Sequence, residues 1–166
     1  MSTRRIFIKN SLGSLAALTI GNEAFSLTKG FSKKEKLGVA LVGLGYYSTD
    51  LLAPALQLTQ YCSLKGIVTG SPDKAKKWQQ QYHIPEKNIY NYQSFDSIVN
   101  NSDIDVIYIV LPPSMHAQYV IKAANAGKHV WCEKPMAISV AECQAMIDAC
   151  KKNKVKLSIG YRMQHE

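Results

Sequence analysis

The chain has 166 residues and a formal net charge of +8 at pH 7. A net +5 of this charge falls in residues 1–36 and only +3 in residues 37–166, where it is scattered over segments with helical patterns. This distribution excludes a dedicated nucleic-acid surface, and the length allows one domain with a proper core after a leader.

Residues 1–26 have the three parts of a removable export signal. These parts are a basic start with Arg4 and Arg5, the apolar stretch 11–20, and the small residues Ala24 and Ser26. The apolar stretch is shorter than the roughly 20 residues that a bilayer core requires, so we predict no membrane anchor. The paired arginines resemble the twin-arginine signal, whose pathway exports folded proteins, although a chance basic start is the alternative. We predict a periplasmic or otherwise exported protein, with the twin-arginine machinery as a partner and a linker at 27–36.

From residue 37 onward, apolar strand-like runs alternate with longer helical patterns. This alternation is typical of an α/β fold in which helices cover both faces of a doubly wound parallel sheet. We predict strands at 37–43, 63–69, 88–92, 105–111, 128–133 and 155–160. We predict helices at 48–59, 72–82, 94–100, 114–126 and 139–152. These elements make one Rossmann-type domain over 37–161.

The first predicted strand runs directly into a G-x-G-x-x-S sequence that begins at Gly43. Gly43 permits a tight turn, Gly45 lets the backbone approach a pyrophosphate, and the following helix start offers free N–H groups. Ser48 stands where a third small residue is usual, and an ordinary strand-to-helix turn is the alternative. We assign five loop residues to cofactor binding, namely Gly43, Leu44, Gly45, Tyr46 and Tyr47.

The second strand ends at Thr69, Gly70 and Ser71, where dinucleotide-binding folds usually carry an acid that binds the adenosine ribose. An acid would repel a 2′-phosphate, whereas the hydroxyl groups here can donate hydrogen bonds to it. Lys74, one turn further on, can neutralise its charge. These residues favour NADP over NAD, and the alternative is that Lys74 only begins a surface helix.

The fourth strand ends at Leu111, Pro112 and Pro113, which should face the cofactor because ligands lie outside the carboxyl ends of such strands. His116 falls in the first turn of the next helix, and we predict that it orients the ligand. A purely structural role is the alternative for this lone histidine.

The fifth strand ends at Glu133, Lys134 and Pro135. A charged pair at the end of an apolar strand must be solvated, form an ion pair, or take part in binding or catalysis. Pro135 holds Lys134 in an extended conformation. Beside an oxidised nicotinamide, Lys134 would take a proton from a substrate hydroxyl while a hydride leaves the carbon. The alternative is a surface ion pair that contributes little.

The four cysteines are predicted to be core thiols rather than a disulfide framework. Cys143 and Cys150 lie on one predicted helix, about 10 Å apart along its axis, which is too far for a bridge. No cysteine or histidine spacing supports a metal site.

The stretch AGKHVWCEKPMA, with LPPSMHAQY before it and SIGYR after it, resembles the glucose-fructose oxidoreductase and inositol dehydrogenase family over residues 37–166. The likeness is greatest to the glucose-fructose oxidoreductase members. It implies an NAD(P)-dependent sugar or polyol oxidoreductase with Lys134 as its essential lysine and Glu133 as the preceding acid. It also implies a cis Lys134–Pro135 peptide and a cofactor or substrate contact from Arg162.

The resemblance further implies a second α/β substrate domain, which would begin at 162–166 and is missing from this chain, and a homo-oligomer in the full-length protein. Some family members are exported by the twin-arginine route because NADP must be bound first. A non-catalytic dinucleotide-binding module is the competing hypothesis, because a fold alone does not establish function. The presence of Lys134 favours the enzyme hypothesis, since a sensor would not need a lysine that transfers protons.

Overall fold

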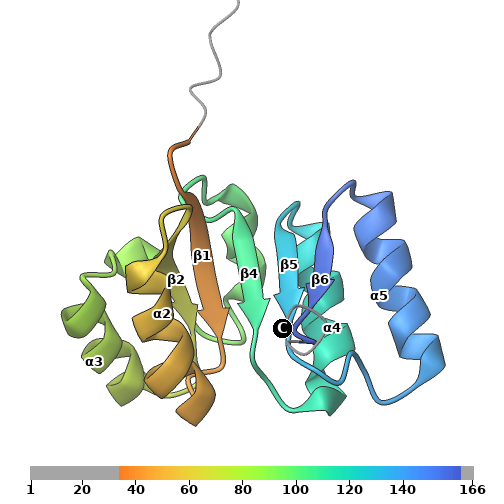
Figure 1. Cartoon of the computed structure of the whole chain (residues 1–166), viewed down its shortest axis with the longest axis horizontal. Helices are drawn as coiled ribbons and strands as arrows, with labels where there is room; N and C mark the ends of the chain where they lie inside the picture. The colour runs from red at the N-terminus through yellow and green to blue at the C-terminus, as the bar shows by residue number, and fades with distance from the viewer. Residues whose placement is uncertain (1–33, 162–166) are drawn as a thin grey trace, which may run out of the picture. The chain divides into compact units, whose positions relative to one another are not determined.

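The apolar runs of the sequence form one sheet of six parallel strands in the order β3-β2-β1-β4-β5-β6 (Figure 1). The computed structural model describes residues 34–161. The strands are β1 Leu37–Val42, β2 Cys62–Val68, β3 Ile89–Tyr90, β4 Val106–Ile109, β5 His129–Cys132 and β6 Leu157–Ile159. This order is that of a Rossmann-type dinucleotide-binding fold, so the predicted fold class is confirmed.

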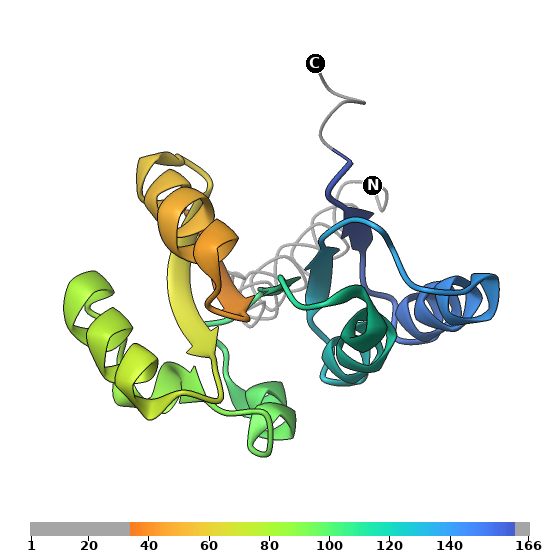
Figure 2. The same ribbon diagram turned by 90° about the horizontal axis from the view of Figure 1, so that it is seen from below.

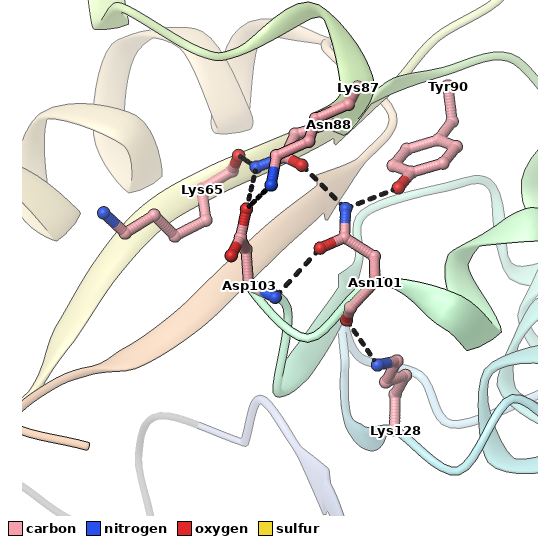
Figure 3. A network of polar contacts seen from close by, with 7 residues as sticks. All are labelled: Lys65, Lys87, Asn88, Tyr90, Asn101, Asp103 and Lys128. Carbon is pink, nitrogen blue, oxygen red and sulfur yellow. Dashed lines mark hydrogen bonds and ion pairs between the residues drawn. The ribbon is translucent and has the colours of Figure 1, made fainter.

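Two layers of helices enclose the sheet. The helical segments are η1 Tyr47–Leu52, α2 Ala53–Leu58, α3 Pro72–Tyr82, η2 Glu86–Asn88, η3 Phe95–Asn100, α4 Pro113–Asn125 and α5 Val140–Lys152. Figure 2 shows α2 and α3 on one face of the sheet and α4 and α5 on the other. Side chains of a strand alternate between the faces, so Ile107 and Ile109 pack in the core with α4, whereas Val106 and Tyr108 point to the side of α2.

The helix that follows the glycine loop is wound more widely at its start than an α-helix. Over η1 the structure is π-helical, and the N–H of Ala53 donates to the carbonyl of Ser48, five residues earlier. Pro54 has no N–H to donate, so a regular α-helical ladder cannot continue through this point. The predicted helix at 48–59 therefore has the right position but two different windings.

Side-chain caps define the starts of α3 and α5. Ser71 Oγ accepts a hydrogen bond from the N–H of Lys74 at 3.4 Å, and Ser139 Oγ accepts one from the N–H of Glu142 at 3.2 Å. Both serines precede the first helical residue, which is the preferred position for such caps. The remaining differences from prediction are small: the third strand is short, and the predicted helix at 94–100 is a 3₁₀ helix.

All four cysteines are free thiols, and Cys132 and Cys150 are buried, whereas Cys62 and Cys143 are half-buried. Burial raises the pKa of Cys132 to about 12, with a smaller effect from the Glu133 charge.

In residues 34–161, no helix combines the length and apolar character needed to cross a bilayer. The same residues contain no cluster of three potential metal ligands among His, Cys, Asp and Glu. The predicted leader at 1–26, most of the linker and the segment 162–166 lie outside the described residues.

Candidate functional site

The predicted site residues gather at the carboxyl edge of the sheet. β1 and β4 are neighbours at the centre of the sheet. The connection after β1 leads to β2 on one side, and the connection after β4 leads to β5 on the other, so a crevice opens between them. The segments that follow β1, β2, β4 and β5 all meet at this edge, because the strands are parallel. Open α/β sheets bind their ligands in this position.

The glycine loop has the backbone that a dinucleotide requires. Gly43 has a φ of +90°, and a Cβ atom at this position would lie 2.3 Å from the carbonyl oxygen of Val110. At Gly45 no described atom lies within 4 Å of the place that a Cβ would take, so the backbone there faces open space. No side chain caps the first helical turn that follows. Open space and free N–H groups beside Gly45 fit a pyrophosphate.

Ser48 is fully buried, and its hydroxyl donates to the carbonyl of Gly43 at 2.6 Å. The hydroxyl therefore satisfies a carbonyl of the glycine loop and ties it to the first helix. The small side chain fits the predicted place of a third small residue in the glycine loop and allows close packing of helix on strand.

The turn after β2 brings Lys74 back to the glycine loop. Thr69 Oγ1 accepts a hydrogen bond from the N–H of Ser71 at 3.2 Å, and Ser71 Oγ caps α3. Lys74 Nζ donates to the carbonyl of Leu44 at 3.0 Å. Both hydroxyl oxygens act as acceptors, which leaves their hydrogens to donate to a phosphate. The cluster of Thr69, Ser71 and Lys74 thus combines two O–H donors and a cation beside the loop.

His116 is fully buried, so the structure does not bring it to the surface of the site. Its Nε2 lies 2.8 Å from the carbonyl oxygen of Leu111, and its Nδ1 lies 2.9 Å from that of Pro135 and 3.3 Å from that of Met136. The imidazole therefore links the segment after β4 to the segment after β5. The predicted orienting role can reach a ligand only through these two segments.

Glu133 and Lys134 are adjacent in sequence but make no side-chain ion pair. The hydroxyl of Tyr108 donates to Glu133 Oε1 at 2.5 Å, and the N–H of Lys134 makes a long contact of 3.4 Å with Oε2. The Lys134 side chain is exposed, and its ammonium has no hydrogen-bond or ionic partner within residues 34–161. The Lys134–Pro135 peptide is cis, as the family resemblance implied. The geometry leaves a free ammonium group at the carboxyl edge.

A hollow of about 320 Å³ opens beside Glu133. Its lining residues are Tyr47, Tyr108, Trp131, Glu133, Ser158, Ile159, Gly160 and Tyr161. The rings of Tyr108 and Trp131 meet edge to face, with centroids 5.6 Å apart. The pKa of Tyr108 is raised well above its usual value, chiefly by burial and also by its hydrogen bond to Glu133. Aromatic walls with one carboxylate suit a flat polar ligand.

The sequence interpretation missed Tyr108, Trp131 and Ser158. Their shared signal is the alternation of side chains within each strand. It places all three on the face of β4, β5 and β6 opposite Ile107, Val130 and Cys132. Of the assigned loop residues, Tyr47 lines the hollow and Tyr46 is exposed. Leu111, Pro112 and Pro113 lie at the same edge, and Arg162 lies outside the described residues.

Residues 37–161 match the model of a protein family described as an oxidoreductase family with an NAD-binding Rossmann fold. The crystal structure of aldose-aldose oxidoreductase from Caulobacter crescentus, complexed with glycerol, is similar, with 48% identity and a TM-score of 0.77 over 79% of this chain and 39% of that one. Inositol 2-dehydrogenase of Salmonella typhimurium is 31% identical over 134 residues, which are 78% of this chain and 38% of that protein. D-xylose 1-dehydrogenase [NADP(+)] of Haloarcula marismortui is 28% identical over 150 residues, which are 85% of this chain and 41% of that protein. The chain spans about two fifths of the length of these relatives.

Proposed function

Because this chain belongs to the glucose-fructose oxidoreductase and inositol dehydrogenase family, we propose that it is the cofactor-binding part of an NADP-dependent oxidoreductase. The substrate would be a sugar or polyol, and the reacting group a CH–OH. The relatives named for an aldose, inositol and D-xylose support this substrate class. Within the family, we place the protein near glucose-fructose oxidoreductase on its motifs. The observation that carries the proposal is the unpaired Lys134 ammonium at the carboxyl edge, next in sequence to Glu133, which lines the hollow there.

The residues of the chain have separate roles in this proposal. When bound, the nicotinamide cofactor supplies a site that accepts or donates a hydride. The glycine loop from Gly43 to Tyr47 would hold the pyrophosphate. Lys134 would take the proton from the substrate hydroxyl, acting as a general base, and would return it in the opposite direction. Glu133, the residue before this lysine, would provide the carboxylate that lines the hollow.

The preference for NADP rests on the position of Lys74 beside the glycine loop. A carboxylate is absent from the end of β2, where Thr69 and Ser71 offer hydroxyl groups instead. The relative named with NADP(+) supports the same cofactor.

Lys74→Met is expected to weaken NADPH binding about tenfold, because a charge-assisted hydrogen bond to the 2′-phosphate would be lost. NADH affinity should change less than about twofold, since NADH has no such phosphate. Fluorescence titration of both nucleotides measures the ratio of the two dissociation constants. Lys76→Met, on the exposed side of the same helix, is the matched control and should leave the ratio unchanged. Tighter binding of NADH than of NADPH by the wild-type protein would contradict the proposed preference for NADP.

A non-catalytic dinucleotide-binding module is the second candidate. The same glycine loop and the same turn after β2 would serve a sensor equally well. An unpaired lysine at the reacting end of the crevice favours the enzyme. Replacement of Lys134 separates the two functions.

We also propose that the protein is exported by the twin-arginine route, with the signal in residues 1–26. Export in the folded state would allow NADP to be loaded before the protein leaves the cytoplasm. A second α/β substrate domain and a homo-oligomeric state are further proposals for the whole protein, and both derive from the family resemblance.

The export proposal predicts that an Arg4→Lys, Arg5→Lys double variant accumulates in the cytoplasm. The charge is conserved, so only the pairing of arginines is lost. Cell fractionation followed by immunoblotting measures the exported share. A Lys29→Arg, Lys33→Arg variant is the matched control and should be exported like the wild type. Undiminished export of the arginine variant would contradict the twin-arginine route.

A further inference from the structure

The carboxylate of Glu133 is held away from its neighbour Lys134. Glu133 follows β5, and its N–H donates to the carbonyl of Ile109 at 3.0 Å, so it continues the pairing with β4. Side chains alternate between faces in extended chain, so Glu133 lies on the side of Trp131. Tyr108 is the β4 residue paired with Trp131, which brings its hydroxyl to Glu133.

Two further contacts surround this carboxylate. A Cβ atom added at Gly160, just after β6, would lie 3.0 Å from Oε1 and 3.3 Å from Oε2 of Glu133. The missing side chain of Gly160 therefore leaves the space that the carboxylate fills. The remaining contact is the long one from the N–H of Lys134 at 3.4 Å. The carboxylate is thus held by its neighbours on β4 and after β6 and not by the lysine ammonium.

We propose that Tyr108 is a positioning residue whose hydroxyl, together with the space at Gly160, holds the Glu133 carboxylate away from the ammonium of Lys134. The inference rests on the proposed function, because it matters only if Lys134 handles a proton. An ammonium paired with a carboxylate is stabilised in its charged form and releases its proton less readily. Holding Glu133 on Tyr108 leaves Lys134 free to exchange a proton with a substrate hydroxyl.

Tyr108 is well suited to this role. Its ring is fixed by edge-to-face packing on Trp131, so the hydroxyl has a defined position. Burial and the nearby carboxylate raise its pKa, so it stays protonated and remains a donor over the pH range in which enzymes are assayed. A hydrogen bond to a charged acceptor is among the stronger kinds in proteins.

Tyr108→Phe in the intact protein tests the inference, because it keeps the ring and removes only the hydroxyl. The freed carboxylate would then turn to Lys134, and the amine would be acylated more slowly. The probe is N-acetoxysuccinimide at a fixed neutral pH without nucleotide or substrate, with labelling of Lys134 followed by peptide mass spectrometry. We expect a rate about twofold to fivefold lower than in the wild type, as for formation of one exposed ion pair. The kcat should fall by a similar factor, while the Kd for NADPH stays unchanged.

A second substitution separates the role of the carboxylate from a general disturbance of the site. In a Tyr108→Phe, Glu133→Gln double variant, no carboxylate remains to pair with the lysine, so the labelling rate should return to the wild-type value. Gly160→Ala should slow labelling as Tyr108→Phe does, because its Cβ displaces the carboxylate from the other side. Tyr119→Phe, a buried tyrosine on α4, is the matched control and should leave the rate unchanged.

Unchanged labelling in a folded Tyr108→Phe variant would overturn the inference, as would slow labelling that persists in the double variant. If Tyr108→Phe does not fold, Gly160→Ala decides the outcome in the same way. Labelling needs no substrate, so it is independent of the proposed activity. Full turnover by a Lys134→Met variant would contradict the proposed function. Normal labelling of Lys134 in Tyr108→Phe would contradict only the proposed role of Tyr108.

Discussion

Lys134→Met is expected to lower kcat about 10²- to 10⁴-fold, the range typical of a lost general acid or base. Methionine keeps an apolar stem of similar length and removes the ammonium, so packing is preserved. The Lys134 side chain is exposed and makes no hydrogen bond or ion pair within residues 34–161, so its loss should not affect folding. The comparison of kcat and of the Kd for NADPH in the intact protein measures the effect, with a sugar or polyol as substrate.

The matched control is Lys152→Met, at the exposed end of α5, which should retain wild-type kcat. The Kd for NADPH should change little in either variant. Near wild-type turnover of Lys134→Met would remove the lysine from the mechanism and would favour the non-catalytic binding module. A sharp loss of NADPH affinity at constant kcat would assign the lysine to cofactor binding alone.

His116→Leu is expected to lower the free energy of unfolding by about 1–3 kcal/mol, because a partly buried backbone carbonyl group would lose its N–H donor. The imidazole contacts the carbonyls of Leu111, Pro135 and Met136 and has no exposed surface. Leucine nearly fills the same volume, so the loss reports the hydrogen bonds more than a cavity. Urea denaturation measures the difference.

His116→Gln keeps N–H donors on a side chain of similar size and should recover part of the stability. NADPH binding should weaken in His116→Leu, because the segments after β4 and β5 would no longer be linked. A loss of stability below about 0.5 kcal/mol, as at an ordinary surface site, would contradict this role.

The sheet and the glycine loop could be predicted because their signals are local. Alternating strand and helix patterns indicate a parallel sheet, and Gly43 occupies a position with φ of +90° that favours glycine. The predicted helices at 72–82 and 139–152 begin within one residue of the observed α3 and α5. Each of these predictions needs only a few consecutive residues.

Other parts of the site depend on contacts between distant segments. Tyr108 meets Glu133 because β4 and β5 pair in one register, and no local pattern specifies that register. The same applies to His116, whose position in the first turn of α4 was predicted but whose partners after β5 were not. The π-helical turn in η1 also requires knowledge of how Pro54 and Ser48 are placed in three dimensions. Sequence patterns identify the residues, whereas the strand register decides which of them touch.

The central place of β1 in the sheet has a consequence for how the domain folds and opens. β1 is the first strand of the described chain, and its partner β4 lies far from it in sequence, since Val39 pairs with Val106. Joining the two halves of the sheet closes a long loop, which has an entropic cost, and such non-local pairing slows folding. Backbone amides of β1 and β4 are covered on both edges by neighbouring strands. Their exchange with deuterated solvent therefore requires cooperative opening of the sheet, whereas amides on the outer edge of β6 can exchange through local fraying.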